Sequence, residues 1–301
     1  MKIVPQVIVA YSHNVSQAVR VHKLPKPGET IRALKASAGM DGGKGTNTAV
    51  AAARSGAEVA MVAHVKGGDW YRKGQKVLEE AGIDNTYVVL GDGIKDSSGV
   101  VLIDDEGNNM IVLGAHNEQT IPNDAMKDAK YCVTGYEINK NSVRHIIHTA
   151  RKLGIKTVVN ASPVLDFVPD YWDAINILIL NEVEILHMLD LAGVSYTDGD
   201  WEEYGRKLRK SYGVGDIVIT LGKNGFFCME GEQIFHSSGI IVESKDTTGA
   251  GDGFQGSMTA RLAMGDSLYE ACLYANRYCA ISVQRDGTIS SYPLAKEVDT
   301  I

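Results

Sequence analysis

The feature of this 301-residue chain that most limits its fold is a regular alternation of short apolar runs with amphipathic runs. Beyond Pro122 the apolar runs have the length of buried strands, and the runs between them repeat apolar residues at helical spacing. Such an alternation requires a mostly parallel sheet with helices on both faces. The segments expected are strands at 131–134, 157–160, 175–180 and 217–221, helices at 140–153, 182–190 and 200–212, and a hairpin at 226–236.

The first half of the chain follows the same rhythm with two interruptions. Strands are expected at 7–11 and 59–65, and helices at 48–55 and 70–81. Residues 12–37 contain a half-apolar extended run, and residues 97–114 have the pattern of a β-hairpin around an acidic, glycine-containing turn. These two segments stand outside the alternation, so we expect them to pair as a small separate sheet.

Composition and charge exclude several classes of function. The net charge of −7 argues against a protein that binds the nucleic-acid backbone, which needs a basic face. No apolar stretch approaches the ~18–20 residues that cross a bilayer, and the start of the chain lacks a signal-peptide pattern. The four cysteines show no CxxC spacing, and the histidines show no zinc-ligand spacing. We therefore expect a cytoplasmic protein with reduced thiols and no membrane or nucleic-acid partner.

One glycine-rich stretch, residues 246–254, carries the strongest chemical signal. A β-rich run is expected to end just before it, at residues 240–242, and a helix to follow, with Phe254, Met258 and Leu262 on one face and Gly265 as the stop. A strand, a glycine turn and a helix aim free backbone N–H groups and the helix dipole at one point. An anion is therefore expected to bind there.

Asp252 is the unusual residue of this stretch, because a carboxylate beside an anion site repels the anion unless the chemistry needs it. An acid that takes a proton from a hydroxyl attacking a phosphate would explain its place. Asp252 with Gln255 also has the spacing of a helix N-cap pair, and both roles can coexist. The spacing Gly251-x-Gly253-x-x-Gly256 matches a dinucleotide fingerprint, but the βαβ unit that this fingerprint needs is not expected here.

Two further motifs point to the same edge of the sheet. The segment 39–47 is rich in glycine and leads into a helix, so a ligand can approach its backbone closely, although it lacks the P-loop spacing. A loop that needs positive φ angles is the alternative explanation for these glycines. Asn181 and Glu184 lie one helical turn apart after a strand, where they could organise water around Mg²⁺ or simply cap a helix.

Taken together, these motifs resemble the ribokinase-like (phosphofructokinase-B-type) carbohydrate kinases over essentially the whole chain, and ribokinase in particular in the segment Gly-Gly-Lys-Gly-x-Asn. The motifs that carry the resemblance are residues 42–52, Asn181 to Glu184, 219–222, 246–252 and 275–276. The resemblance implies an α/β fold, a single Rossmann-like three-layer αβα sandwich with a small β-sheet lid formed by residues 12–37 and 97–114. A lid with an exposed face and open edges predicts a homodimer formed lid to lid.

The resemblance also implies an activity and its residues. We expect an ATP-dependent kinase that phosphorylates a primary hydroxyl of a pentose, ketohexose or related polyol, with Asp252 as general base. The amides of Gly249, Ala250 and Gly251 would form the anion hole, and the sugar pocket would contain Asn14, Ser16, Gly42, Gly43, Lys44, Asn47, Glu137 and Asp252. Asn181, Thr220, Gly222 and Asn276 would bind ATP, Asn181 and Glu184 would act on Mg²⁺ through water, and Asp246, Thr248, Gly287 and Ser291 would bind a monovalent cation such as K⁺.

Two positions depart from the ribokinase pattern. Ser16 replaces an aspartate that holds sugar hydroxyls in ribokinase, so the sequence does not establish ribose as the substrate. Gly253 replaces the usual threonine or serine after the catalytic aspartate, at a cost of about 0.5–1 kcal/mol of helix propensity. A nucleoside kinase of the same family remains an alternative, with Tyr11, His13 and His116 as candidates for contacting a base. A catalytically silent sugar sensor is a second alternative, disfavoured by the presence of Asp252 and the complete anion hole.

Overall fold

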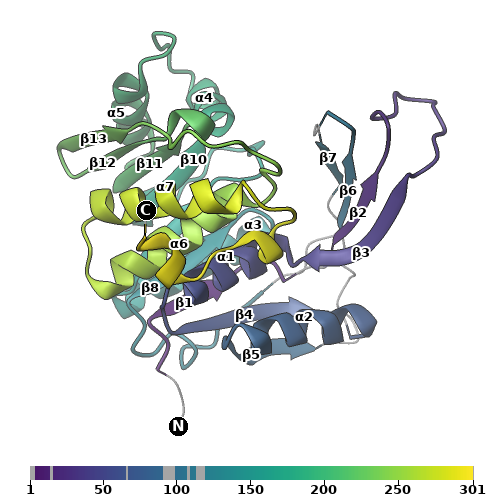
Figure 1. Ribbon diagram of the computed structural model, residues 1–301. Coiled ribbons are helices and arrows are strands. Elements are labelled where there is room, and N and C mark those ends of the chain that lie inside the picture. The colour runs from purple at the N-terminus through teal and green to yellow at the C-terminus, as the bar shows by residue number, and fades with distance from the viewer. Residues whose placement is uncertain are drawn as a thin grey trace.

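The computed structural model describes residues 4–13, 16–65, 67–90, 99–106, 109–112 and 119–300. Its body is built on a nine-stranded sheet with the order β13-β12-β11-β10-β9-β8-β1-β4-β5 (Figure 1). Neighbouring strands from β11 to β5 are parallel, and β12 and β13 add an antiparallel edge. The strands are β1 (Val7–Ala10), β4 (Val59–Val65), β5 (Asp84–Leu90), β8 (Tyr131–Gly135), β9 (Lys156–Asn160), β10 (Ile177–Asn181), β11 (Asp216–Thr220), β12 (Phe226–Glu230) and β13 (Gln233–Ser237).

Helices cover the sheet on both faces, which gives the expected three-layer αβα sandwich. Helices α1, α6 and α7 lie side by side on the face toward the viewer in Figure 1, while α3, α4 and α5 pack on the strands from β8 to β12. Among the described residues, no helix is long and apolar enough to cross a membrane. The helices are α1 (Gly43–Arg54), α2 (Asp69–Glu80), α3 (Lys140–Leu153), α4 (Glu182–Leu191), α5 (Trp201–Tyr212), α6 (Ala250–Met264), α7 (Leu268–Ser282) and α8 (Ala295–Val298), with short 3₁₀ turns η1 (Trp172–Ala174), η2 (Gly222–Asn224) and η3 (Ile289–Ser291).

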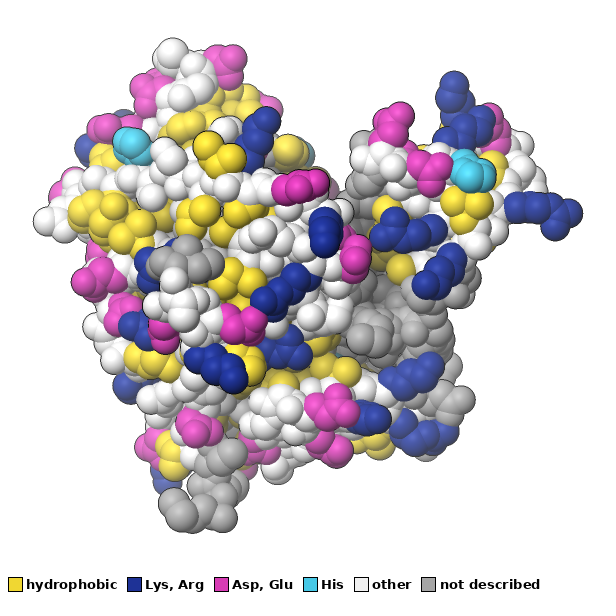
Figure 2. All heavy atoms as spheres, viewed as in Figure 1, with side chains coloured by type: hydrophobic (Ala, Val, Ile, Leu, Met, Phe, Trp, Pro, Cys, Tyr) yellow, Lys and Arg dark blue, Asp and Glu magenta, His cyan; other side chains and the backbone are white. Residues whose placement is uncertain are grey.

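A second sheet stands away from the body. Its strands are β2 (Ser16–Arg20), β3 (Lys35–Asp41), β6 (Gly99–Ile103) and β7 (Asn109–Val112), in the order β3-β2-β6-β7. The pairing of the two segments that broke the alternation is thus observed, although β3 starts and ends later than the expected extended run at 30–37. Figure 2 shows this sheet as a separate lobe with a notch between it and the body.

Two β segments differ from the sequence-based expectations. Strand β5 was missed because it is an edge strand in which only Val88 is buried, so it lacks a continuous apolar run. The prediction of a β-rich run at 240–242 is wrong, because these residues lie in no strand and Ile241 is 99% exposed. Their apolar side chains line a cavity, described below, instead of pairing in the sheet.

Helix α1 also differs, since it begins at Gly43 and not at residue 48. Its glycines serve close packing as well as backbone freedom. A Cβ at Gly45 would lie only 2.7 Å from Tyr11 Cβ and 2.8 Å from the backbone nitrogen of Ser12. The first turn of α1 can therefore pack directly against the end of β1, which brings the helix start to the carboxyl edge of the parallel strands.

Candidate active site

The carboxyl ends of β1 and β8 meet the first turns of α1 and α6 at one edge of the sheet. Ligands of open α/β sheets bind at this edge. Strand β2 of the second sheet follows β1 after a short connection, and β3 leads directly into α1, so this sheet is joined to the body at the same place (Figure 1).

Asp252 lies in the first turn of α6 and is only 4% exposed. Its Oδ2 accepts a hydrogen bond of 2.9 Å from Asn47 Nδ2, and its Oδ1 lies 3.6 Å from Lys44 Nζ. The prediction that Asp252 caps the helix is wrong, because the N-cap residue is Gly249, which has φ 73° and no side-chain cap bond. The carboxylate is instead held by two side chains of α1.

The surroundings of Asp252 suit a group that must gain a proton. Burial raises the pKa of Asp252 above that of an ordinary aspartate, while the charge of Lys44 and the hydrogen bond from Asn47 oppose the rise. The charge of Asp252 in turn raises the pKa of Lys44 despite the burial of the lysine, so Lys44 stays protonated. A desolvated carboxylate beside a fixed cation can act as a general base.

Glu137 completes this cluster from the loop after β8. Its Oε2 accepts a 2.6 Å hydrogen bond from Ser12 Oγ and a 2.9 Å hydrogen bond from the backbone nitrogen of Lys44. Ser12 Oγ also accepts from the backbone nitrogen of Gly45 at 3.1 Å. None of the sequence motifs assigned a role to Ser12. Its buried hydroxyl holds both the carboxylate of Glu137 and the start of α1.

The remaining expected sugar-site positions differ in how far the structure describes them. Gly42 is the N-cap of α1 and donates its N–H to Asn47 Oδ1 at 3.3 Å, and Gly43 follows it with φ 73°. Ser16 lies in β2, where only its backbone is described. Asn14 and His116 lie outside the described residues.

The start of α6 contains the three residues expected to form an anion site. A Cβ at Gly249 would lie 2.9 Å from Tyr292 Oη, so both its positive φ and its close packing require glycine. The Ala250 amide donates to the carbonyl of Thr247 at 3.1 Å, whereas Gly251 lies at the second helix position, where N–H groups lack an intrahelical partner. Packing explains why a glycine occupies position 253, because a Cβ there would lie 3.2 Å from Tyr292 Cε1 and 3.4 Å from Tyr278 Cε1.

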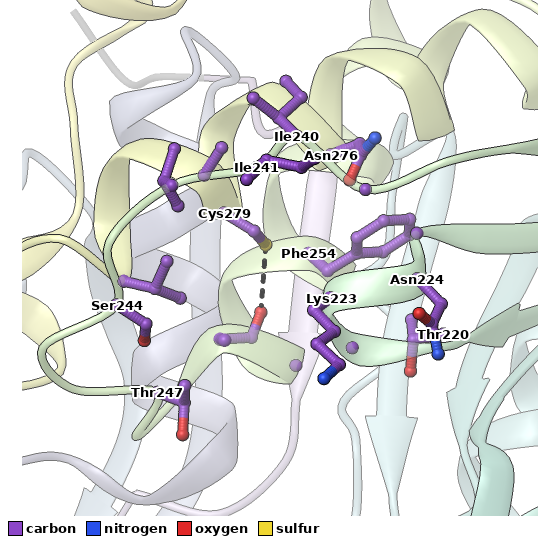
Figure 3. Close-up of a pocket in the computed structure, with 18 residues that line it drawn as sticks. Thr220, Lys223, Asn224, Ile240, Ile241, Ser244, Thr247, Phe254, Asn276 and Cys279 are labelled. Carbon is purple, nitrogen blue, oxygen red and sulfur yellow. Dashed lines mark hydrogen bonds between the residues drawn. The ribbon is translucent and has the colours of Figure 1, made fainter.

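A cavity of about 590 Å³ opens beside this helix start (Figure 3). Thr220, Gly222 and Asn276 line it together with Ala250 and Gly251, so three of the four expected nucleotide residues and two of the expected anion-hole residues share one pocket, whereas Asn181 does not line it. The volume is within the range of small-molecule sites. One wall is apolar and is formed by Ile240, Ile241, Val242, Ala280 and Val283.

Asn181 and Glu184 form a complete capping box at the start of α4. Asn181 Oδ1 accepts from the Glu184 nitrogen at 2.8 Å, and Glu184 Oε2 accepts from the Asn181 nitrogen at 2.8 Å, which confirms the cap interpretation. Asn181 pairs with Thr220 across β10 and β11, so the box adjoins the cavity. The pair offers carboxylate and amide oxygens there, the ligand type that suits Mg²⁺.

Three of the four expected monovalent-cation positions come together. Asp246 accepts hydrogen bonds from the backbone nitrogens of Thr248, at 2.9 Å, and Gly287, at 3.1 Å. The hydroxyl of Ser291 is directed elsewhere, because it bonds Ser282 Oγ and the carbonyl of Thr288, each at 2.7 Å. Both carboxylate oxygens of Asp246 therefore accept backbone N–H groups, and the Ser291 side chain is engaged with other residues.

A buried carboxylate in the first turn of a helix, beside a cavity of small-molecule size in an α/β fold, is the arrangement expected of a phosphoryl-transfer enzyme. Residues 8–295 match the model of the pfkB family carbohydrate kinases, and the chain belongs to that family. It is an ATP-dependent sugar kinase, as the sequence motifs predicted.

Similar proteins agree with this assignment over nearly the whole chain. The chain is 29% identical to ribokinase from Staphylococcus aureus, over 98% of this chain and 99% of the relative, and 30% identical to ribokinase from Mus musculus, over 92% and 88%. It is 28% identical to deoxyribokinase from Salmonella typhi, over 95% of each chain. Among solved structures, ribokinase from Cryptococcus neoformans in complex with ADP shares 26% identity with a TM-score of 0.85 over 98% of each chain. Arabidopsis thaliana ribokinase complexed with ribose and ATP shares 25% identity with a TM-score of 0.83 over 98% of each chain.

Proposed function

We propose that this enzyme transfers the γ-phosphate of ATP to the primary hydroxyl of a pentose or a closely related sugar, with Asp252 as the general base. The observation that carries the proposal is the buried carboxylate of Asp252, held by Lys44 and Asn47 at the start of α6. A base in this position can take the proton of a bound hydroxyl while the γ-phosphate lies at the helix N-terminus.

Each group of residues then has a separate task. Glu137, Asn47 and the first turn of α1 hold the sugar, with Asn14 and Ser16 supplied from the segment that leads into the lid. Gly249, Ala250 and Gly251 stabilise the charge of the transferred group, and Thr220, Gly222 and Asn276 bind the nucleotide. Lys44 stays protonated and offsets negative charge beside Asp252. The lid sheet excludes water when the sugar is bound.

Two cations are part of the proposal. Mg²⁺, held through water by Asn181 and Glu184, would neutralise charge on the β- and γ-phosphates when bound. A monovalent cation such as K⁺ would bind near Asp246, Thr248 and Gly287, behind the anion hole. We place the enzyme in the cytoplasm, a reducing compartment that suits its four free cysteines.

The nucleoside-kinase alternative loses support from two of its candidate residues. Tyr11 is fully buried and its hydroxyl donates to the carbonyl of Ser162, at 3.3 Å. His13 is 6% exposed and its Nδ1 lies 2.7 Å from Thr46 Oγ1, so both rings are part of the protein interior. Neither ring offers a free face for a nucleobase.

The substrate is tested by measuring phosphorylation with ATP and Mg²⁺ across ribose, 2-deoxyribose, ketohexoses, sugar phosphates and nucleosides. We expect a pentose or related sugar to be the best acceptor, because the similar proteins include ribokinases and a deoxyribokinase. Best turnover of a nucleoside would contradict the proposal. Thermal stabilisation by a sugar without turnover of any acceptor would favour the silent sensor.

Ser16 is expected to make ribose a poor ligand compared with an enzyme that has aspartate at this position. A carboxylate that accepts hydrogen bonds from sugar hydroxyls contributes about 1.5–3 kcal/mol, which corresponds to a factor of roughly 10 to 100 in affinity. Ser16→Asp should therefore raise kcat/KM for ribose and lower it for the best substrate of the wild type. If the wild type already prefers ribose and Ser16→Asp lowers that activity, the interpretation of Ser16 is wrong.

The lid is proposed to form a homodimer contact. Leu34, Val100, Met110 and Val112 are between 39% and 61% exposed on or beside the lid sheet. Light scattering at micromolar concentration should give the mass of a dimer, and Val112→Glu should give that of a monomer. Val168→Glu is the matched control, because Val168 is 55% exposed on the body. A monomeric wild type would contradict the proposal.

A further inference from the structure

Lys223 lies at the centre of η2, the turn that directly follows the carboxyl end of β11. Its side chain is exposed and lines the cavity, and Figure 3 shows it extending into the cavity near Phe254. No role for this side chain follows from the motifs that identify the family, because those motifs end at Gly222. A structural role for Lys223 is also weak, since an exposed lysine stem contributes little packing.

Among the described residues that line the cavity, Lys223 alone is charged. Within the described part of the chain, no carboxylate lies within ion-pair distance of its Nζ. A single unpaired ammonium in a neutral, largely apolar cavity makes that cavity attractive to an anion. The charge therefore favours a ligand that carries negative charge at the level of η2.

The two ends of the cavity determine which part of such a ligand Lys223 meets. At one end, Figure 3 shows Ile240 and Ile241, whose apolar side chains suit a flat base. At the other end, Ala250 and Gly251 begin α6, the proposed site of the transferred phosphate. Figure 3 shows Lys223 on the same side of the cavity as Thr220 and Asn224, away from Ile240 and Ile241.

We propose that Lys223 binds the α- and β-phosphates of the nucleotide, the phosphates that remain with ADP after transfer. This inference rests on the proposed function, since it takes the cavity as the ATP site. Lysine suits the task because its ammonium is a compact charge on a flexible stem and can follow the phosphates as the γ-phosphate leaves. Lys223 is then a determinant of affinity for nucleoside di- and triphosphates, and it does not act on the sugar hydroxyl.

The test compares the affinities of the full-length enzyme for adenosine, AMP and ADP by calorimetry, without sugar. Lys223→Met keeps the length of the side chain and removes its charge. We expect ADP to bind about 10-fold more weakly to Lys223→Met, the effect of losing one charge-assisted hydrogen bond, and adenosine to bind equally well. Lys223→Arg should retain most of the affinity for ADP. Lys127→Met, a change of an exposed lysine outside the cavity, is the control and should bind like the wild type.

A second readout is the salt dependence of ADP binding. The wild type should lose affinity with rising ionic strength more steeply than Lys223→Met, because a screened charge contact is present only in the wild type. Equal affinities of the two proteins for ADP, or an equal loss for adenosine and ADP, would overturn the role of Lys223 while leaving the cavity as the ATP site. A wild type that binds neither adenosine, AMP nor ADP would overturn the ATP site, and the role of Lys223 with it.

Discussion

Asp252→Asn is expected to lower kcat at least ~100-fold, within the range observed when a general base is lost. Asparagine keeps the size of the side chain and can still contact Asn47, but it cannot accept the proton of the sugar hydroxyl. Binding of the sugar should change far less, because Glu137 and the first turn of α1 remain in place. Steady-state kinetics and sugar titrations of the two proteins measure this difference.

The pH dependence of the wild type gives an independent check on the same base. Burial raises the pKa of Asp252, so the acid limb of kcat/KM should lie at a higher pH than an ordinary aspartate would give. Activity is lost as the pH falls through this limb, because the protonated acid cannot act as a base. Lys44→Met removes the charge that opposes the rise and should move the limb further upward.

Thermal unfolding separates a catalytic loss from a structural one. Asp252→Asn should lower the unfolding temperature only moderately, because the Lys44 charge loses its partner while removal of the buried carboxylate relieves a desolvation cost. If Asp252→Asn kept most of its kcat, the buried side chain would serve only as an acceptor for Asn47. A loss of activity that accompanied a large loss of stability would likewise leave the base unassigned.

The elements that could be predicted from the sequence are those with strong periodicity. Helix α3 and strand β4 were predicted with the observed bounds, because each has a clear apolar repeat and a distinct start and stop. Strand β5 could not be found in this way, since an edge strand with a single buried residue has no such repeat. The apolar run at 240–242 has the composition of a strand, but it lines a cavity, a role that composition does not reveal.

The residues of the candidate site also divide into those that the sequence predicted and those that it did not. The glycine and aspartate motifs identified Asp252, Lys44 and Asn47, which the structure brings into direct contact. Two features of the site could not be predicted, because they depend on tertiary geometry. Ser12 binds Glu137 from a position 125 residues away, a relation that no local pattern contains. The capping interpretation of Asp252 failed because Gly249 begins the helix three residues earlier, so the carboxylate points toward α1.

The packing of helix α1 on helix α6 sets the distance between Asp252 and the side chains of Lys44 and Asn47. Lys44 and Asn47 lie on α1 and Asp252 on α6, and the helices pack together at Gly256. A Cβ at Gly256 would lie 2.8 Å from Ala51 Cβ and 3.0 Å from the backbone nitrogen of Ala52, and closer still to the carbonyl of Thr48. The obstructing atoms are mostly backbone, so they cannot move without a shift of the helix.

Gly256→Ala is therefore expected to lower both stability and kcat. Overpacking of this kind costs about 1–3 kcal/mol, and each kcal/mol lowers the Tm by roughly 2–4 °C in a chain somewhat smaller than this one. Displacing α1 from α6 also lengthens the contacts of Asp252 with Asn47 and Lys44, and a misplacement of about 1 Å can reduce kcat by 10²-fold. Differential scanning calorimetry and steady-state kinetics measure the two effects.

Gly205→Ala is the matched control for Gly256→Ala. Gly205 is also a buried helical glycine, but a Cβ there would meet only side-chain atoms, Phe227 Cε1 at 3.1 Å and Met229 Cε at 3.2 Å. The ends of these two side chains can move by a few tenths of an ångström. Alanine also has a helix propensity up to about 1 kcal/mol more favourable than that of glycine. Gly205→Ala should therefore leave the Tm and kcat close to the wild-type values. If both variants behaved alike, close packing of α1 on α6 would not control the geometry around Asp252.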